Sequence, residues 1–277
     1  MKLKKRLKRY VQQLDFQLHK KKLSLKYDSF SSFNEEQILK DYVAELLPED
    51  DNRFFVDIGA GDGVRRSNTY AFVQEGWRGL GVESDVENTY KLAKAYKYYP
   101  NAALCRMSVT PDNVIPLLQA YQVEKNFGVL SLDIDSYDYW VLDAVFSEYR
   151  PQIVVTEINE KIPPPVKFAV KFIPDFRMTH HFYGYSIASL AELCEKHGYA
   201  IVNLEYNNAF LVPHELSPTP LSTETIYRQG YLDRADRLDK FPLNADMEPL
   251  YSLNAEDALK FINDFYARDR DKFEASI

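Results

Sequence analysis

The chain has 277 residues, of which 45% are hydrophobic and 27% are charged, so it can bury a core and is not wholly disordered. It lacks an apolar run of about 18 residues, which argues against a membrane-spanning helix. Its two cysteines, Cys105 and Cys194, exclude a disulfide framework and a four-cysteine zinc site. Lone thiols and the lack of a secretory signal predict a cytoplasmic protein.

The first predicted element is a basic amphipathic helix within residues 1–28. Residues 1–26 carry ten Lys or Arg and one acid, Asp15. Apolar residues recur at helical spacing, namely Leu3, Leu7, Tyr10, Val11, Leu14 and Leu18. Two interpretations stay open: the helix packs on the body or on a second copy in a homo-oligomer, or it lies peripherally on the anionic inner membrane surface. The remaining chain has 24 basic and 40 acidic residues, which argues against a nucleic-acid partner.

From residue 29 to residue 214, predicted strands alternate with predicted helices. The expected strands are 53–59, 78–83, 102–107, 127–134 and 152–158, and the expected helices are 67–75, 86–98, 113–121, 139–148 and 186–197. Two last strands, 199–206 and 209–213, read as a hairpin. The pattern predicts an α/β fold, Rossmann-like and doubly wound, with a mostly parallel seven-stranded sheet ending in an antiparallel hairpin strand. Residues 215–277, with a helix expected at 255–267, read as an appendage that acts as a lid or oligomer arm.

The most informative stretch is Asp57–Gly63, Asp-Ile-Gly-Ala-Gly-Asp-Gly, at the end of the first predicted strand. Glycines at 59, 61 and 63 let the backbone turn tightly and approach a ligand closely. Open parallel sheets bind ligands at the carboxyl ends of their strands. Glu83, twenty residues after Gly63, ends the second strand, where an acid can accept hydrogen bonds from both hydroxyls of a ribose. A glycine turn without a ligand and a nicotinamide site are the competing interpretations.

The acid-x-G-x-G-x-G pattern resembles the first motif of class I S-adenosylmethionine-dependent methyltransferases. A narrower resemblance is to the FkbM-type family, through residues 68–69, 76–79, 130–140, 151–159 and 162–164. The resemblance implies S-adenosylmethionine as cofactor and methylation of an oxygen on a sugar, glycan or natural-product acceptor. The implied cofactor-binding residues are Asp57, Gly59, Gly61, Gly63, Asn68, Thr69, Glu83, Met107, Ser108 and Asp133.

Oxygen ligands follow the fourth and fifth predicted strands. Asp133 and Asp135 end one strand, and Glu157 and Asn159 end the next. Neighbouring strands lie about 4.8 Å apart, so these side chains can converge beside the methyl donor. Mg²⁺ prefers such ligands, and a metal there would lower the pKa of the acceptor hydroxyl. In the alternative interpretation, Asp133 contacts only the cofactor and Glu157 binds only loop backbone.

Candidates for removing the acceptor proton are Asp135 and two histidines, His180 and His181. The histidines lie in a polar and aromatic loop, residues 177–186, after the fifth predicted strand. An imidazole with a pKa near 6.5 is a suitable base at neutral pH. A purely structural role for either histidine is the competing interpretation. Tyr137 and Tyr183 are the expected stacking platforms for an acceptor ring.

Three function classes therefore compete. The first is the methyltransferase, with or without Mg²⁺. The second is a glycosyltransferase in which Asp133–Asp135 is a D-x-D motif for a metal and a nucleotide-sugar, although the glycine motif would then have no role. The third is a methyltransferase-shaped binding protein without catalysis.

Overall fold

The computed structural model describes residues 2–47, 53–174, 176, 178, 181–217 and 221–277. Its centre is a seven-stranded sheet of order β3-β2-β1-β4-β5-β8-β7. These strands are β1 (Phe54–Ile58), β2 (Arg78–Glu83), β3 (Ala102–Arg106), β4 (Val129–Leu132), β5 (Ile153–Glu157), β7 (Tyr199–Glu205) and β8 (Asn208–Pro213). β1 to β5 pair in parallel, and β8 runs antiparallel to both β5 and β7. The predicted fold class, including its single reversed strand, is confirmed.

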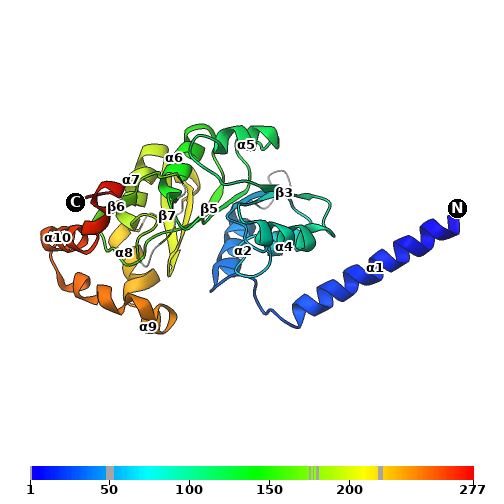
Figure 1. The fold of residues 1–277 in the computed structure, drawn as a ribbon, viewed down its shortest axis with the longest axis horizontal. Coiled ribbons are helices and arrows are strands. Elements are labelled where there is room, and N and C mark those ends of the chain that lie inside the picture. The colour runs from blue at the N-terminus through cyan, green and yellow to red at the C-terminus, as the bar shows by residue number, and fades with distance from the viewer. Residues whose placement is uncertain (1, 48–52, 175, 177, 179–180, 218–220) are drawn as a thin grey trace.

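Helices cover both faces of this sheet (Figure 1). One face packs on α2 (Glu35–Leu46), α3 (Tyr70–Gln74) and α4 (Val86–Tyr96), and the other on α5 (Val114–Ala120), α6 (Asp138–Glu148) and α7 (Ile187–His197). Successive strand residues face opposite layers. In β1, Phe55 belongs to the first layer and Val56 to the second, and both are fully buried. Burial on both faces explains why the central strands read as continuous apolar runs.

The C-terminal segment packs on the sheet domain through buried contacts. It contains α8 (Thr223–Tyr227), α9 (Arg237–Lys240), α10 (Ala255–Phe265) and the strand β9 (Phe273–Ser276). β9 pairs antiparallel with β6 (Lys167–Val170) in a second, two-stranded sheet. The Tyr227 hydroxyl donates a hydrogen bond of 2.6 Å to the carbonyl of Glu160. The residues that were expected to form an appendage thus share a core with the loop that follows β5.

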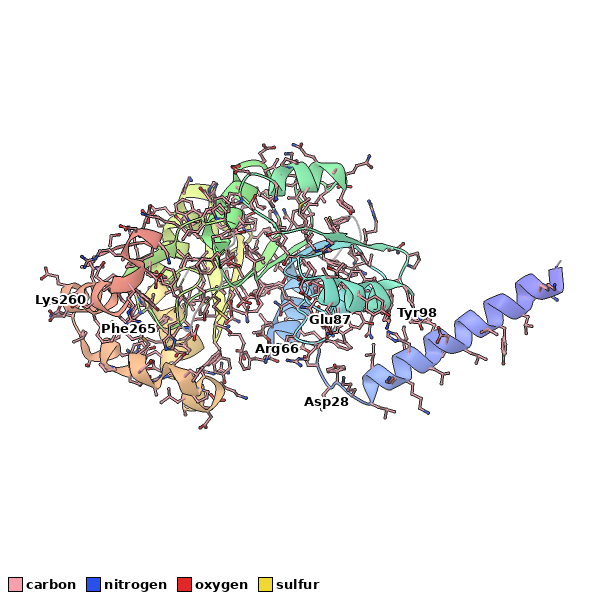
Figure 2. All side chains as sticks on the ribbon, viewed as in Figure 1. Asp28, Arg66, Glu87, Tyr98, Lys260 and Phe265 are labelled. Carbon is pink, nitrogen blue, oxygen red and sulfur yellow. The ribbon has the colours of Figure 1, made fainter. Side chains whose placement is uncertain are left out.

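The N-terminal segment forms a long helix, α1 (Lys2–Ser24), that projects from the body (Figure 1). The helix predicted from the basic amphipathic pattern is therefore present. It contacts the body near Tyr98, which lies beside the C-terminal half of the helix (Figure 2). Among the residues that the structure describes, no helix is both long and apolar enough to span a bilayer.

Candidate functional site

The loop after β1 depends on its first glycine. Gly59 has φ +91°, and a Cβ built on it would lie 1.6 Å from the carbonyl oxygen of Asp133. The amide groups of Gly59 and Ala60 both donate to the carbonyl of Val82, at 2.9 and 3.0 Å. The loop is thereby held between the ends of β2 and β4. Gly61 also has a positive φ, +55°, but a Cβ there meets nothing within 4 Å.

The helix after this loop begins later than expected. α3 starts at Tyr70, so its N-terminus does not directly follow Gly63. Gly63 instead allows close packing, because a Cβ there would lie 2.4 Å from a methyl carbon of Leu92 in α4. The amide donors beside the site therefore belong to the loop itself.

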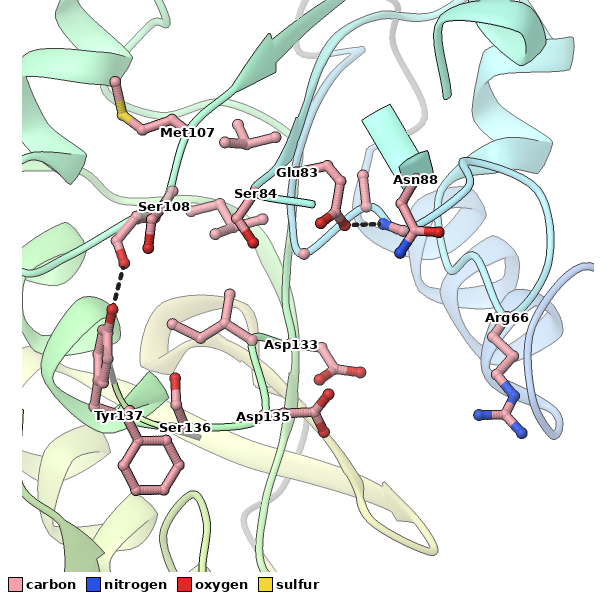
Figure 3. A pocket seen from close by; sticks show the side chains of 18 of the residues that line it. Arg66, Glu83, Ser84, Asn88, Met107, Ser108, Asp133, Asp135, Ser136 and Tyr137 are labelled. Carbon is pink, nitrogen blue, oxygen red and sulfur yellow. Dashed lines mark hydrogen bonds between the residues drawn. The ribbon is translucent and has the colours of Figure 1, made fainter. Parts of the chain in front are cut away.

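Glu83, the last residue of β2, is fixed in position by the backbone. One carboxylate oxygen accepts a hydrogen bond from the amide of Gly61 at 2.8 Å (Figure 3), and the other accepts from the amide of Asp85 at 2.7 Å. Only 8% of Glu83 is exposed. Because a carboxylate oxygen has more than one acceptor direction, both oxygens can accept further hydrogen bonds from a ligand.

A cavity of about 500 Å³ opens at the carboxyl ends of β1 to β4. We call it the loop cavity. It brings together several predicted cofactor residues: Gly59, Gly61, Glu83, Met107, Ser108 and Asp133. Its walls also include Asp135, Tyr137, Arg65 and Arg66. The sequence interpretation missed the two arginines, although they follow the glycine motif directly.

Three other predicted cofactor residues lie beneath the loop cavity or beside it. Asp57 is buried and accepts a hydrogen bond of 2.6 Å from the Thr69 hydroxyl, which ties β1 to the start of α3. Burial raises the pKa of Asp57 to about 6. Asn68 lines a neighbouring cavity that is described below, and its side-chain amide donates to the Ser131 hydroxyl at 3.4 Å. Asp57 and Thr69 thus support the loop from below.

Three carboxylates meet where β4 and β5 end. One oxygen each from Asp133, Asp135 and Glu157 lies within 4.8 Å of the others. Burial and the neighbouring Asp135 and Asp138 raise the pKa of Asp133 to about 8. Burial, Asp133 and Asp135 raise the pKa of Glu157 well above its ordinary value. When ionised, these carboxylates repel one another, and a bound divalent cation would reduce that repulsion.

The turn that carries the acidic cluster is held by Asp138, a residue to which the sequence assigned no role. Its two carboxylate oxygens accept from the amides of Ile134 and Ser136, at 2.8 and 2.9 Å. Asp135 stands between them with φ +55°. Figure 3 shows the carboxylates of Asp133 and Asp135 pointing toward the side on which Arg66 lies. The turn thus presents Asp135 at the surface of the site.

A second cavity of about 630 Å³ adjoins the loop cavity, and we call it the outer cavity. The two cavities share four lining residues, Arg65, Arg66, Asp133 and Asp135. The outer cavity is otherwise lined by residues from distant parts of the chain, including Phe30, Phe33, Glu157, Asn207, Lys240 and Phe241. The acidic cluster therefore stands at the boundary between two spaces.

Asn159 was expected to bind a metal through its side-chain oxygen, and that Oδ1 atom has no hydrogen-bond partner among the described residues. It is fully buried, and its side-chain amide donates to the carbonyls of His181 and Tyr183 at 2.9 and 3.0 Å. Its amide group is therefore engaged in holding the loop after β6, two residues beyond the acidic cluster along the chain.

Of the two histidines expected as bases, the structure describes only His181. His180 lies outside the described residues. The Nε2 atom of His181 lies 2.9 Å from a carboxylate oxygen of Asp246, and its ring packs near Phe265. Among the described residues, those lining the loop and outer cavities do not include His181. The loop turns this ring toward the C-terminal segment, which the sequence could not indicate.

The two tyrosines expected as stacking platforms differ in location. Tyr137 borders the loop cavity and donates a hydrogen bond of 3.0 Å to the carbonyl of Val109. Tyr183 is buried, and its hydroxyl lies within hydrogen-bond distance of Glu160 and Lys161. Tyr183 therefore belongs to the core below the C-terminal segment.

No protein-family model matches the chain, and no curated protein matches it. Among the solved structures that match the chain are the following three. An S-adenosylmethionine-dependent methyltransferase from Clostridium acetobutylicum ATCC 824 is 10% identical over 72% of this chain and 98% of that chain, with a TM-score of 0.43. The N-terminal domain of EvdMO1 with S-adenosylhomocysteine bound is 11% identical over 65% of this chain and 80% of that chain, with a TM-score of 0.42. The CurJ carbon methyltransferase is 12% identical over 64% of this chain and 53% of that chain, with a TM-score of 0.43.

Identities this low, with TM-scores below 0.5, do not decide function. Function therefore has to be argued from the residues of the two cavities.

Proposed function

We propose that this chain is an S-adenosylmethionine-dependent methyltransferase that methylates a hydroxyl of a sugar, glycan or related natural product. The observation that carries the proposal is the loop cavity. Its walls combine a glycine loop, a fixed carboxylate at the end of β2, and acidic groups at the end of β4. Each of these parts suits a different part of the methyl donor.

The adenosine end of the donor fits the side of the cavity near β2 and β3. Glu83 is held by two backbone amides, so its carboxylate is already oriented for the two ribose hydroxyls. Met107 and Val109 offer apolar surface to an adenine ring. Gly61 allows the backbone to come close to the ligand, since no side chain occupies the space beside it.

The methionine end of the donor fits the side near β4. S-adenosylmethionine carries a positive sulfonium and a positive ammonium, and cations beside Asp133 and Asp135 favour the ionised form of these carboxyl groups. Arg65 and Arg66 line the same space and suit the donor carboxylate. A nucleotide-sugar would instead bring a diphosphate toward the acidic side chains, so it fits this cavity only with a cation between them. Charge complementarity therefore favours the sulfonium donor.

The outer cavity suits the acceptor. It meets the loop cavity at Asp133 and Asp135, so a hydroxyl bound there would face the donor. Two of its aromatic residues, Phe33 and Phe241, offer ring faces on which a sugar ring can stack. Because the sulfonium is already activated, the protein has to orient the acceptor and accept its proton. We assign proton acceptance to Asp135, whose pKa is raised by burial.

The acidic cluster also fits a divalent cation. Asp133, Asp135 and Glu157 present carboxylate oxygens close together, which is the donor set that Mg²⁺ prefers. A bound cation would act as a Lewis acid on the acceptor hydroxyl. Asp135 would then be one of the residues holding the cation and would still accept the proton that the hydroxyl loses, whereas without a cation it accepts that proton directly. We leave Asn159 out of this ligand set because it is fully buried and its side-chain nitrogen holds loop carbonyls, although its Oδ1 has no hydrogen-bond partner among the described residues.

The cofactor assignment is tested by calorimetric titration with S-adenosylhomocysteine, and separately with a nucleotide-sugar in the presence and absence of Mg²⁺. We expect metal-independent binding of S-adenosylhomocysteine, weakened at least about tenfold by Glu83→Gln. Glu87→Gln is the matched control, because Glu87 is exposed on α4 and pairs only with Lys91 in the structure's described contacts. Binding of the nucleotide-sugar alone would instead identify a glycosyltransferase.

The metal and acceptor assignments are tested by mass shift of a panel of sugar and glycan acceptors, with and without EDTA. If a cation takes part, EDTA abolishes transfer and added Mg²⁺ restores it. Undiminished methyl transfer in EDTA would rule out a role for the metal and leave Asp135 as the direct base. Donor binding without methylation of any hydroxyl acceptor, but with transfer to carbon or nitrogen, would contradict the proposed oxygen chemistry.

A further inference from the structure

Helix α1 has two apolar faces, and the body covers one of them. Phe16 packs against Tyr98 and Tyr99, with ring centroids 5.6 and 5.5 Å apart. The Nε2 atom of His19 lies 3.3 Å from the Tyr70 hydroxyl, and Leu23 is 9% exposed. These residues fall on one side of the helix and attach its C-terminal half to the body.

The opposite side of α1 carries an apolar stripe that remains in solvent. The stripe consists of Leu7, Tyr10, Val11, Leu14 and Leu18, which are each between 46% and 67% exposed. At roughly 100° per residue, these five positions fall within an arc of about 100°, centred nearly opposite Phe16. The spacing is too regular for scattered surface residues, and a continuous exposed apolar patch marks an interaction surface.

The surroundings of the stripe are strongly basic. α1 has nine Lys or Arg residues and a single acid, Asp15. Asp15 is already engaged by the Tyr98 hydroxyl at 2.6 Å and by Lys97 at 3.5 Å. The exposed basic residues whose side chains are described, Lys4, Arg6, Lys21 and Lys22, lie among or beside the stripe residues at helical spacing.

The positive charge continues onto α4. A groove of about 410 Å³ where α1 meets α4 is lined by lysines from both sides, Lys22 and Lys26 on one and Lys91, Lys94 and Lys97 on the other. Asp62 also borders the groove, and Glu87 lies 3.0 Å from Lys91, so part of the charge is compensated. The excess is still cationic and adjoins the helix.

Charge decides between the possible occupants of the stripe. A second copy of α1 would bring nine cations against nine, whereas paired helices usually match opposite charges beside their apolar seam. A nucleic acid would satisfy the lysines but leave the apolar stripe uncovered. An anionic bilayer offers both acyl chains for the stripe and negative headgroups for the lysines.

We propose that α1 lies in the surface of an anionic lipid bilayer, with the stripe inserted and the groove between α1 and α4 at the headgroups. Tyr10 is a residue type favoured at that depth because its ring is apolar and its hydroxyl is polar. The proposal does not rest on the methyltransferase assignment, since it uses none of the residues of the two cavities.

The test is flotation of the full chain with phosphatidylcholine vesicles, with and without phosphatidylglycerol. We expect binding only to the anionic vesicles and release by high salt. Leu14→Glu with Leu18→Glu should reduce that binding at least about tenfold, whereas Leu243→Glu should not. Leu243 is the matched control because it is 72% exposed and lies in the C-terminal segment.

The lysines are tested with Lys21→Gln combined with Lys22→Gln, against Lys260→Gln as control. Lys260 is exposed on α10, at the other end of the molecule from α1 (Figure 2). We expect several-fold weaker binding only from the first variant. Thermal unfolding of each variant checks that the protein is folded. We expect every variant to fold, because the substituted positions are exposed.

Two outcomes would overturn the proposal. One is a folded wild-type chain that does not float with anionic vesicles at low salt. The other is a dimer in sedimentation velocity that the stripe variant makes monomeric, without flotation, which would identify a second copy as the occupant.

Discussion

Two alanine substitutions in the same loop are expected to lower stability by different amounts. Gly59→Ala places a Cβ 1.6 Å from the carbonyl oxygen of Asp133, at a residue with φ +91°. Gly61→Ala places a Cβ in space where nothing lies within 4 Å, at φ +55°. The two changes are chemically identical and two residues apart, so their difference isolates the packing at the end of β4.

The magnitudes follow from strain and overlap. A left-handed backbone costs a residue with a Cβ about 1–2 kcal/mol, and both variants bear this cost. Gly59→Ala also pushes the end of β4 away from the loop. Overpacked cores lose about 1–3 kcal/mol of stability, and we expect a similar additional loss here. We therefore expect about 2–5 kcal/mol of lost stability for Gly59→Ala, or roughly 5–15 °C in Tm. Gly61→Ala should lose only about 1–2 kcal/mol.

Ligand affinity should separate the variants in a second way. Gly61 lines the loop cavity, so its added methyl group should weaken binding of S-adenosylhomocysteine at least about tenfold. Thermal unfolding and calorimetric titration of both proteins measure the two effects. Equal stability of the two variants would refute the close approach of Gly59 to Asp133. Unchanged affinity of Gly61→Ala would refute the placement of the ligand.

Three further outcomes can be measured by unfolding. Burial raises the folded-state pKa of Asp57 from 3.8 to about 6, so the folded chain holds the proton more tightly and the free energy of unfolding falls as pH rises from about 4 to about 6. Asp57→Asn should lack this fall of roughly 2–3 kcal/mol, and parallel pH curves would contradict it. Glu160→Ala should cost about 3–5 kcal/mol, because it removes the partner of the buried Lys161. The exposed pair of Lys125 and Glu148 is the control, and Glu148→Ala should cost no more than about 1 kcal/mol. Asn159→Ala should lower stability by about 1–3 kcal/mol without changing metal affinity, whereas loss of metal binding would restore Asn159 as a ligand.

Much of the sheet could be predicted because its signals are local. Each parallel strand is a short apolar run followed by a turn and a helix, so residues 78–83 were placed without error as β2. The boundaries of longer runs were less accurate. Residues 127–134 predicted a long strand, but β4 covers Val129–Leu132 because Asp133 already turns away into the site.

The small sheet could not be predicted from the sequence. β6 has four residues after a proline-rich loop, and its partner β9 lies about a hundred residues further along the chain. Neither segment has an alternating pattern long enough to be recognised, and their pairing is set by the shared core around Phe168 and Phe273.

The candidate site divides in the same way. Gly59 and Glu83 follow their own strands directly, so strand prediction places them at the loop cavity. His181 depends on a loop whose direction is set by Asn159 and by Tyr266, which donates to its carbonyl at 2.8 Å. Contacts of this kind join distant residues and leave no trace in local spacing.

The pairing of β6 with β9 has a consequence for synthesis on the ribosome. β1 to β5, with the glycine loop and the acidic cluster, are made before the chain reaches residue 160. The core around Phe168 needs Tyr266 and Phe273, which are made about a hundred residues later. During translation, the nascent chain can therefore assemble its parallel strands while the apolar side chains of β6 wait uncovered for their partner. Chaperone contacts with the nascent chain should concentrate on that segment.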